Sequence, residues 1–222
     1  MRLKLYYDFL SQPSRALYIF LKKCNIPFEP QFVNLWKLEN FKPEFEKINP
    51  WKKIPCIEHK GFLLSESVGI FRYLCREFKV DDHWYPKDSQ LQAKVDEYLE
   101  WQHLNTRLHC TTYFRVKYLL PLRTGKPAKA DVARDLQASM IECLDHIEHI
   151  WLKDNKPFIA NDSISIADIL AACEIEQPRL ADYDPREGRP NLTAWLDRVS
   201  KELSPHYNHA HAGVNEVSSK YK

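Results

Sequence analysis

The hydrophobic pattern of this 222-residue chain changes near residue 80, and the change divides the sequence into two unlike parts. Before that point, segments with the two-residue period of a strand alternate with segments of helical spacing. Beyond it, every periodic segment has helical spacing. The sequence therefore predicts an α/β unit followed by an all-helical unit.

The first part begins with a strand that leads through a short loop into a helix. Leu3, Leu5 and Tyr7 alternate with their neighbours, which is the pattern of a half-buried strand. Apolar residues then recur at helical spacing over 16–24, and Pro13 suits the first turn because no N–H is needed there. Such a helix start directs backbone N–H groups and a positive dipole end at the loop, which favours an anion.

Five further elements are predicted in the first part. They are a strand over 28–35, a short helix over 43–48, strands over 52–59 and 62–64 joined by a turn, and a helix over 68–78. Pro30 cannot donate a sheet hydrogen bond, so its strand is expected at an edge. Ser65 or Ser67 is expected to cap the last helix.

The second part begins after residues 80–88, which predict a linker, and its helices are expected at 89–118, 131–154, 165–177 and 192–203. Ser165 is placed as an N-cap with Asp168 three residues later, so Asp168 is interpreted as a structural capping residue. From residue 206 onward a short, polar, solvated tail is predicted. The histidines at 206, 209 and 211 could suggest a metal, but a solvated tail is the preferred interpretation.

Composition excludes several classes of protein. The chain has 44% hydrophobic and 28% charged residues and a net charge of +2, so nothing requires a nucleic acid or an anionic membrane as partner. Neither a signal peptide nor an apolar run of about 18 residues is recognisable. The six cysteines never occur as Cys-x-x-Cys, so reduced thiols and a cytoplasmic location are expected.

Ser11 lies at the mouth of the first helix, where two interpretations are open. Ser is a preferred N-cap, so Ser11 on its own is explained as a structural cap. It could also donate its hydroxyl hydrogen to an anion held by the helix start. Ser14 is a second candidate for the working hydroxyl.

Four motifs occur in a fixed order along the chain. They are Asp8-x-x-Ser11-Gln12-Pro13-x-Arg15, Asn49-Pro50-x-Lys52-Lys53-Ile54-Pro55 followed by Leu64-x-Glu66-Ser67, Asp96-Glu97-Tyr98-Leu99-x-Trp101-Gln102-His103, and Ser165-Ile166-Ala167-Asp168. Together they resemble the cytosolic glutathione S-transferases of the serine type, most of all the theta class. The resemblance implies a thioredoxin-like domain over 1–79, a linker over 80–88 and an all-helical electrophile-site domain over 89–222.

The same resemblance implies an activity. A theta-like enzyme would add the thiolate of glutathione, its co-substrate, to small electrophiles in detoxification, and it could also reduce organic peroxides. No metal is implied, and family precedent implies a homodimer. The alternative is a binding, carrier or interaction protein that keeps the fold without turnover, although such a protein has no reason to keep Ser11, Lys53, Glu66 and Ser67 together.

Ser11 has chemistry suited to this activity. A free thiol has a pKa of ~8.5, and lowering it by two units requires about 2.7 kcal/mol. A hydrogen bond to a charged group contributes about 1.5–3 kcal/mol and a helix N-terminus up to ~2 kcal/mol. Ser11 could therefore activate the thiol as a hydrogen-bond donor without a histidine base. Tyr7 is another candidate, because tyrosine-type relatives carry a hydroxyl near the end of the first strand.

The remaining glutathione contacts follow from the resemblance. The bond between Ile54 and Pro55 is expected to be cis, with the Ile54 backbone pairing with the cysteinyl part of glutathione. Lys53 would hold the glycine carboxylate. Glu66 would accept from the γ-glutamyl ammonium, and Ser67 would hold the α-carboxylate at a helix start.

Three further positions are candidates for the site. Arg107 either contacts glutathione or substrate, or forms a surface salt bridge, and Asn105 is a weaker candidate beside it. Asn40 stands where many theta members have a histidine, and it can hydrogen-bond but carry no charge. Arg15 is interpreted as an anchor of the domain interface. The short tail is expected to leave the electrophile site open, which puts the class preference for small halides and sulfate esters in doubt.

Overall fold

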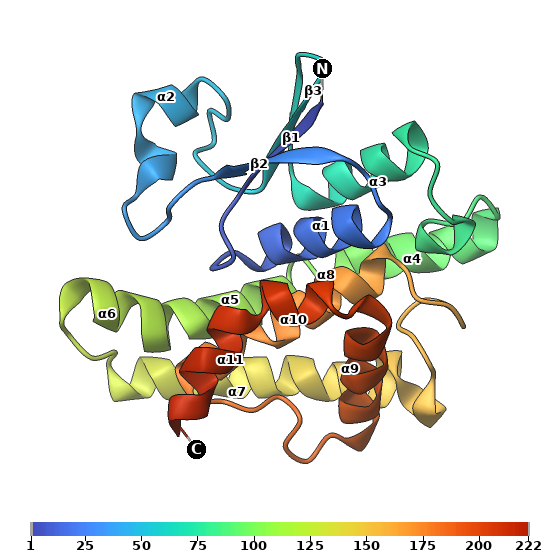
Figure 1. The fold of residues 1–222 in the computed structure, drawn as a ribbon. Helices are drawn as coiled ribbons and strands as arrows, with labels where there is room; N and C mark the ends of the chain where they lie inside the picture. The colour runs from blue at the N-terminus through green and yellow to red at the C-terminus, as the bar shows by residue number, and fades with distance from the viewer. Residues whose placement is uncertain (1, 222) are drawn as a thin grey trace.

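The computed structural model describes residues 2–221 and contains an α/β domain followed by helices (Figure 1). The first domain consists of β1 (Leu3–Tyr7), α1 (Gln12–Lys23), β2 (Phe28–Phe32), η1 (Glu39–Phe41), α2 (Pro43–Glu46), β3 (Cys56–His59), β4 (Phe62–Ser65) and α3 (Ser67–Glu77). The predicted order of strands and helices is confirmed. The expected thioredoxin-like α/β domain is therefore present.

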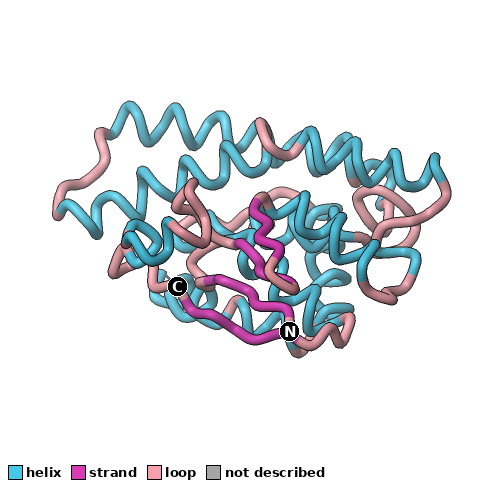
Figure 2. Tube along the Cα trace, turned by 90° about the horizontal axis from the view of Figure 1, so that it is seen from above, coloured by secondary structure: helices cyan, strands magenta, loops and turns pink. Residues whose placement is uncertain are grey.

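The four strands form one sheet in the order β2-β1-β3-β4. β1 runs parallel to β2, with Leu3 opposite Phe28, and antiparallel to β3, with Leu5 opposite Ile57. Figure 2 shows the strands grouped together near the middle of the view, with helices around them. β2 is an edge strand, as Pro30 predicted, because only one neighbour needs its hydrogen bonds.

Helix α1 lies between the sheet and the second domain (Figure 1). Its apolar residues Leu17, Phe20 and Leu21 are fully buried. On the side of the second domain, Arg15 is also fully buried and donates to the carbonyl oxygen of Cys173 at 2.8 Å. The interpretation of Arg15 as an interface anchor is confirmed.

The second domain is helical. After η2 (Asp82–Trp84) it contains α4 (Ser89–Trp101), α5 (Thr106–Phe114), η3 (Arg115–Leu119), α6 (Leu120–Thr124), α7 (Ala130–His146), η4 (Ile147–Trp151), η5 (Lys153–Asn155), α8 (Ile166–Ile175), η6 (Gln177–Ala181), α9 (Pro190–Leu203), α10 (His206–Ala210), α11 (Ala212–Ser218) and η7 (Ser219–Tyr221). Among the described residues no strand follows β4, as expected.

The prediction of a single helix over 89–118 is wrong, because the helix is interrupted between α4 and α5. Asn105 has φ −119° and ψ −97°, which is not helical backbone. Its side-chain amide donates to the carbonyl oxygen of Trp101 at 2.8 Å. An asparagine that bonds to nearby backbone in this way competes with the helical hydrogen bonds.

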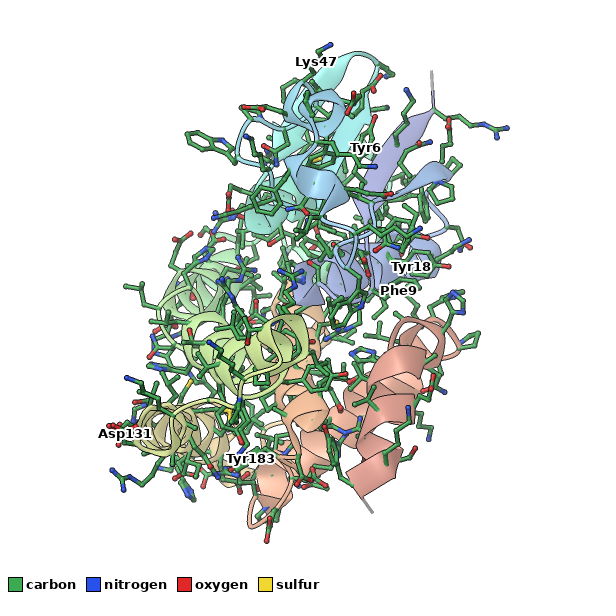
Figure 3. All side chains as sticks on the ribbon, turned by 90° about the vertical axis from the view of Figure 1, so that its left-hand side faces the viewer. Tyr6, Phe9, Tyr18, Lys47, Asp131 and Tyr183 are labelled. Carbon is green, nitrogen blue, oxygen red and sulfur yellow. The ribbon has the colours of Figure 1, made fainter. Side chains whose placement is uncertain are left out.

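The solvated tail predicted from residue 206 is also wrong. Tyr207, Ala210, His211 and Val214 are buried, at the i, i+3, i+4 and i+7 positions of a helical face. The His209 ring packs edge-on against Phe9, and Figure 3 shows Phe9 at the boundary between the two domains. The C-terminal segment therefore packs against the first domain.

Two further predictions are confirmed. Ser165 and Asp168 form a complete capping box at the start of α8. All six cysteines are free thiols. Within residues 2–221 no helix is both long and apolar enough to cross a membrane.

Candidate active site

A cavity of about 250 Å³ opens between the two domains. The first domain contributes the start of α1, the loop before β3 and the start of α3, while the second contributes one face of α5 and the end of α8. Its walls are formed by Ser11, Gln12, Pro13, Asn49, Lys53, Ile54, Pro55, Ser65, Glu66, Ser67, Arg107, Thr111 and Glu174. Five of the predicted site residues therefore meet here with Arg107 of the second domain.

Ser11 occupies the N-cap position of α1 and faces this cavity. Its Oγ accepts from the backbone N–H of Ser14 at 3.4 Å and donates to the carbonyl oxygen of Ile54 at 3.4 Å. Both hydrogen bonds are long, so the hydroxyl can be redirected at little cost. The two interpretations of Ser11 are compatible, since it caps the helix and also presents a hydroxyl to the cavity.

The other two hydroxyl candidates are less well placed. Ser14 is fully buried and its Oγ has no partner among the described residues, but it is not part of the cavity wall. The Tyr7 ring packs against Phe9, Tyr18 and Phe32, outside the cavity wall. Burial raises the pKa of the Tyr7 phenol. The geometry favours Ser11.

The loop before β3 is held by two buried asparagines. Asn49 donates to the carbonyl oxygen of Lys53 at 2.7 Å, and Asn40 donates to that of Lys52 at 2.8 Å. Lys53 itself is exposed and lines the cavity, and the peptide bond between Ile54 and Pro55 is cis, as expected. Asn40 lies behind the loop rather than in the cavity wall.

The start of α3 differs from the prediction, because neither Ser65 nor Ser67 caps it. The N-cap position is Glu66, with φ +66° and no side-chain capping bond, and Ser67 is the first helical residue. Glu66 is exposed at the cavity, whereas Ser67 is buried. The Ser67 hydroxyl is free of a capping role and accepts from Arg107 Nη2 at 3.0 Å.

Arg107 reaches across the cavity from α5 to the first domain. Besides its bond to Ser67, it donates through Nε to Glu174 Oε1 at 2.7 Å. Glu174 is fully buried, and burial raises the pKa of its carboxyl, an effect that the Arg107 charge opposes. Arg107 is therefore neither a surface salt bridge nor free. Asn105 lies at the break before α5, outside the cavity wall.

Gln12, Thr111 and Glu174 are among the cavity residues that the sequence did not predict as members of the site. Gln12 donates to the Thr111 hydroxyl at 2.8 Å, which joins the start of α1 to α5. Thr111 lies four residues after Arg107, hence on the same helix face. Glu174 had a readable signal, because it is a carboxylate within a helix that is otherwise almost wholly apolar.

Two further features of the molecule are weaker candidates for a site. A cavity of about 360 Å³ lies within the helical domain, but the arginines lining it, Arg179 and Arg186, are already paired with the buried Glu176. Among residues 2–221, no group of three or more His, Cys, Asp or Glu side chains is arranged to hold a metal. The interdomain cavity is the stronger candidate, since its polar groups converge from several elements.

Comparisons with known proteins agree with the geometry. The family model of the glutathione S-transferase N-terminal domain matches residues 1–76, and that of the C-terminal domain matches residues 111–202. The chain is 42% identical to human glutathione S-transferase theta-1 over 199 residues, covering 90% of this chain and 82% of the relative. It is 40% identical to mouse glutathione S-transferase theta-3 over 203 residues, covering 91% and 84%.

Solved structures show the same similarity. Human glutathione S-transferase T1-1 without ligand superposes with a TM-score of 0.93 at 38% identity, covering 98% of this chain and 91% of that one. Human glutathione transferase theta-2 in complex with glutathione gives a TM-score of 0.92 at 35% identity, covering 99% and 90%.

Proposed function

This chain belongs to the glutathione S-transferase family as a theta-class glutathione transferase, and on that premise we propose that Ser11 activates the glutathione thiol in the interdomain cavity. The observation that carries the proposal is the position of the Ser11 hydroxyl, which lies both at the N-terminus of α1 and in the cavity wall. A thiolate at this point would receive a hydrogen bond and the favourable field of the helix start.

The first step is ionisation of the thiol. The proton leaves to water, Ser11 turns its hydroxyl from the Ile54 carbonyl oxygen to the sulfur, and the thiolate becomes the attacking atom. Its electron pair forms the bond to the electrophile, whose leaving group departs with the electrons of the broken bond. Ser11 donates a hydrogen bond throughout and forms no covalent bond.

The rest of glutathione is proposed to lie along the cavity wall. The Ile54 backbone would pair with the cysteinyl part, and Lys53 would attract the glycine carboxylate. At the other end, Glu66 would accept from the ammonium group, while Ser67 and Arg107 would bind the α-carboxylate. The distance of 3.0 Å between Arg107 Nη2 and Ser67 Oγ supports a shared carboxylate site.

Two of the predicted contacts are proposed to act indirectly. Asn40 would fix the loop that carries Lys53, because it holds the carbonyl oxygen of Lys52. Asn105 would set the start of α5, and so the place of Arg107, through its bond to the Trp101 carbonyl oxygen. Neither side chain lines the cavity.

The electrophile is proposed to bind next to Ser11 against an apolar wall. Leu10, which precedes Ser11, belongs to a hydrophobic cluster with Phe114, Tyr118, Val214 and Val217. Helix α11 contributes to this cluster and would therefore cover part of the proposed electrophile site, which was expected from the sequence to be open. A small apolar electrophile suits such a wall, and an organic peroxide would be a second class of substrate.

A homodimer, a cytoplasmic location and a role in detoxification complete the proposal. The free thiols agree with a reducing compartment. Large apolar side chains exposed on β4 and around α4 and α5 support a subunit interface. They are Phe62, Leu63, Leu91, Leu104 and Leu108.

Sedimentation of the wild type and of Leu104→Glu would test the dimer, with Leu122→Glu on α6 as the control. Both leucines are more than half exposed, at 74% and 58%. We expect the wild type and Leu122→Glu to be dimers and Leu104→Glu to be a monomer. A wild-type monomer at micromolar concentration would rule the interface out.

Thiolate absorbance of bound glutathione against pH tests the catalytic proposal. We expect a thiol pKa depressed by at least one unit in the wild type and restored in Ser11→Ala. An unshifted pKa in both would mean that Ser11 is not the activator, and the absence of conjugation would then favour the binding-protein alternative.

A further inference from the structure

Glu174 is the unusual member of the cavity wall. It lies near the end of α8, every residue of which is buried, and its own side chain is fully buried. Its Oε1 accepts from Arg107, whereas Oε2 has no hydrogen-bond partner among the described residues. A buried carboxylate is unfavourable unless it is paired with a cation, and among the described residues its ion-pair partner is Arg107.

Arg107 is fixed from both sides of the cavity. Its Nε is held by Glu174 in the second domain and its Nη2 by Ser67 in the first domain, at 2.7 and 3.0 Å. A guanidinium is planar and its donors point in fixed directions, so holding Nε sets where the two terminal nitrogens point. The side chain is partly exposed at 23%, so these nitrogens remain accessible from the cavity.

We propose that Glu174 is a positioning residue for the γ-glutamyl α-carboxylate of glutathione, acting by holding Arg107 beside Ser67. The inference rests on the proposed glutathione site and adds the residue that determines its selectivity at this end. Glu174 does not contact glutathione in this arrangement. Its effect is to keep the Arg107 guanidinium of the second domain beside the Ser67 hydroxyl of the first, so that both domains bind the α-carboxylate of glutathione.

Removal of the charge at residue 174 has a defined consequence. In Glu174→Gln the side chain keeps its size, but the charge that restrains Arg107 is lost. Arg107 would then sample several rotamers, and binding would have to order it again. The loss should fall on ligands that carry the α-carboxylate, and it should leave the sulfur end, at Ser11, unchanged.

The control residue lies two positions further along the chain. Glu176 is as deeply buried as Glu174 and is paired with Arg179 and Arg186, but it lies outside the interdomain cavity. Glu176→Gln therefore makes the same chemical change in a buried ion pair. It should lower stability without changing ligand selectivity.

The experiment measures dissociation constants by calorimetry for two ligands. One is glutathione, and the other is the tripeptide in which 4-aminobutyrate replaces the γ-glutamyl residue, so that the α-carboxylate is missing. We expect Glu174→Gln to weaken glutathione binding at least ~10-fold, the size of a lost charge-assisted contact. Binding of the analogue should change less than about two-fold, and Glu176→Gln should keep the wild-type preference.

A positioning role also predicts a separation of kinetic constants. KM for glutathione should rise in Glu174→Gln, while kcat at saturation and the thiol pKa of bound glutathione stay at wild-type values. Glu174→Asp keeps the charge but retracts it by one methylene, so it should recover part of the preference. If the Gln variant does not fold, the Asp variant replaces it, with a smaller expected loss.

Equal weakening of both ligands, or an unchanged preference for glutathione, would overturn the inference. The proposed function fails separately, if the wild-type protein binds glutathione without a shift of the thiol pKa or does not bind it. If the wild type binds glutathione with a shifted thiol pKa and Glu174→Gln keeps the preference for glutathione over the analogue, only the role of Glu174 is contradicted.

Discussion

The guanidinium of Arg15 lies 2.6 Å from Oε1 of Gln177, and this contact joins α1 of the first domain to η6 of the second. The same side chain donates to the carbonyl oxygens of Phe9 and Cys173 at 2.7 and 2.8 Å. Gln177 in turn donates to the carbonyl oxygen of Leu10, next to Ser11. The loop that carries the proposed catalytic hydroxyl is therefore held by the domain interface.

Replacing Arg15 by Met should lower the free energy of unfolding by about 3–5 kcal/mol, because two buried acceptors and one partly buried acceptor would lose their donor. Arg15→Lys should lose a similar amount, since one ammonium group cannot reproduce the fork. Denaturant titration measures the change. Arg134→Met on the exposed face of α7 is the control, expected within about 0.5 kcal/mol of wild type. Equal stability of the Arg15 and Arg134 variants would contradict the interface role.

Ser11→Ala should lower kcat about 10- to 100-fold near neutral pH, the equivalent of one charge-assisted hydrogen bond. The loss should shrink as pH rises toward the pKa of free glutathione, because the thiolate then forms without help. Stability should fall by about 1 kcal/mol because an N-cap is removed. Ser14→Ala is the matched control. A pH-independent loss would show that Ser11 does not act on the thiol.

Lys53→Gln should raise KM for glutathione about three- to five-fold and leave kcat unchanged, because an ion pair at an exposed lysine contributes only about 1 kcal/mol. Raised salt should weaken wild-type binding more than binding by the variant. Lys47→Gln makes the same charge change at the far end of the first domain, where Figure 3 labels Lys47. Identical KM values for the two variants would exclude a contact between Lys53 and glutathione.

His211 should make the protein sensitive to acid. Burial lowers its pKa to about 3, with Arg15 and Arg179 acting in the same direction and Glu176 opposing them. Below pH ~6.5 the unfolded chain binds a proton that the folded chain does not, so stability falls as pH decreases from there toward 3. The slope from this group is about 1.4 kcal/mol per pH unit.

His211→Phe should remove this contribution, which corresponds to one proton, from the slope of stability against pH. Denaturant titration at several pH values measures the free energy of unfolding and so the slope. The ring stacks on Tyr207 at a centroid distance of 4.1 Å, so Phe is a close replacement. His209→Asn, at an exposed position of α10, is the control and should keep the wild-type slope. Parallel pH profiles for wild type and His211→Phe would refute this source of acid sensitivity.

The sequence alone was sufficient for features set by neighbours in the chain. Alternation and helical spacing predicted the order of the first seven strands and helices, and Pro30 predicted the edge strand, because these depend on local backbone chemistry. Ser165 and Asp168 predicted their own capping box for the same reason. Ser11, Lys53, Glu66 and Ser67 could be proposed from motifs because each lies at a loop or helix start with a recognisable pattern.

Tertiary structure decided the features that depend on how the two domains dock. Arg107 and Glu174 are 67 residues apart, and Gln12 and Thr111 are 99 apart, so no local pattern could pair them. The helices within residues 206–218 were not predicted from the sequence. Polar residues are more numerous there than apolar ones, and only a narrow apolar face packs against the rest of the protein. The sequence determined which chemical groups are present. The docking of the two domains determined which of them are in contact, because a charge that docking buries is unfavourable unless it is paired.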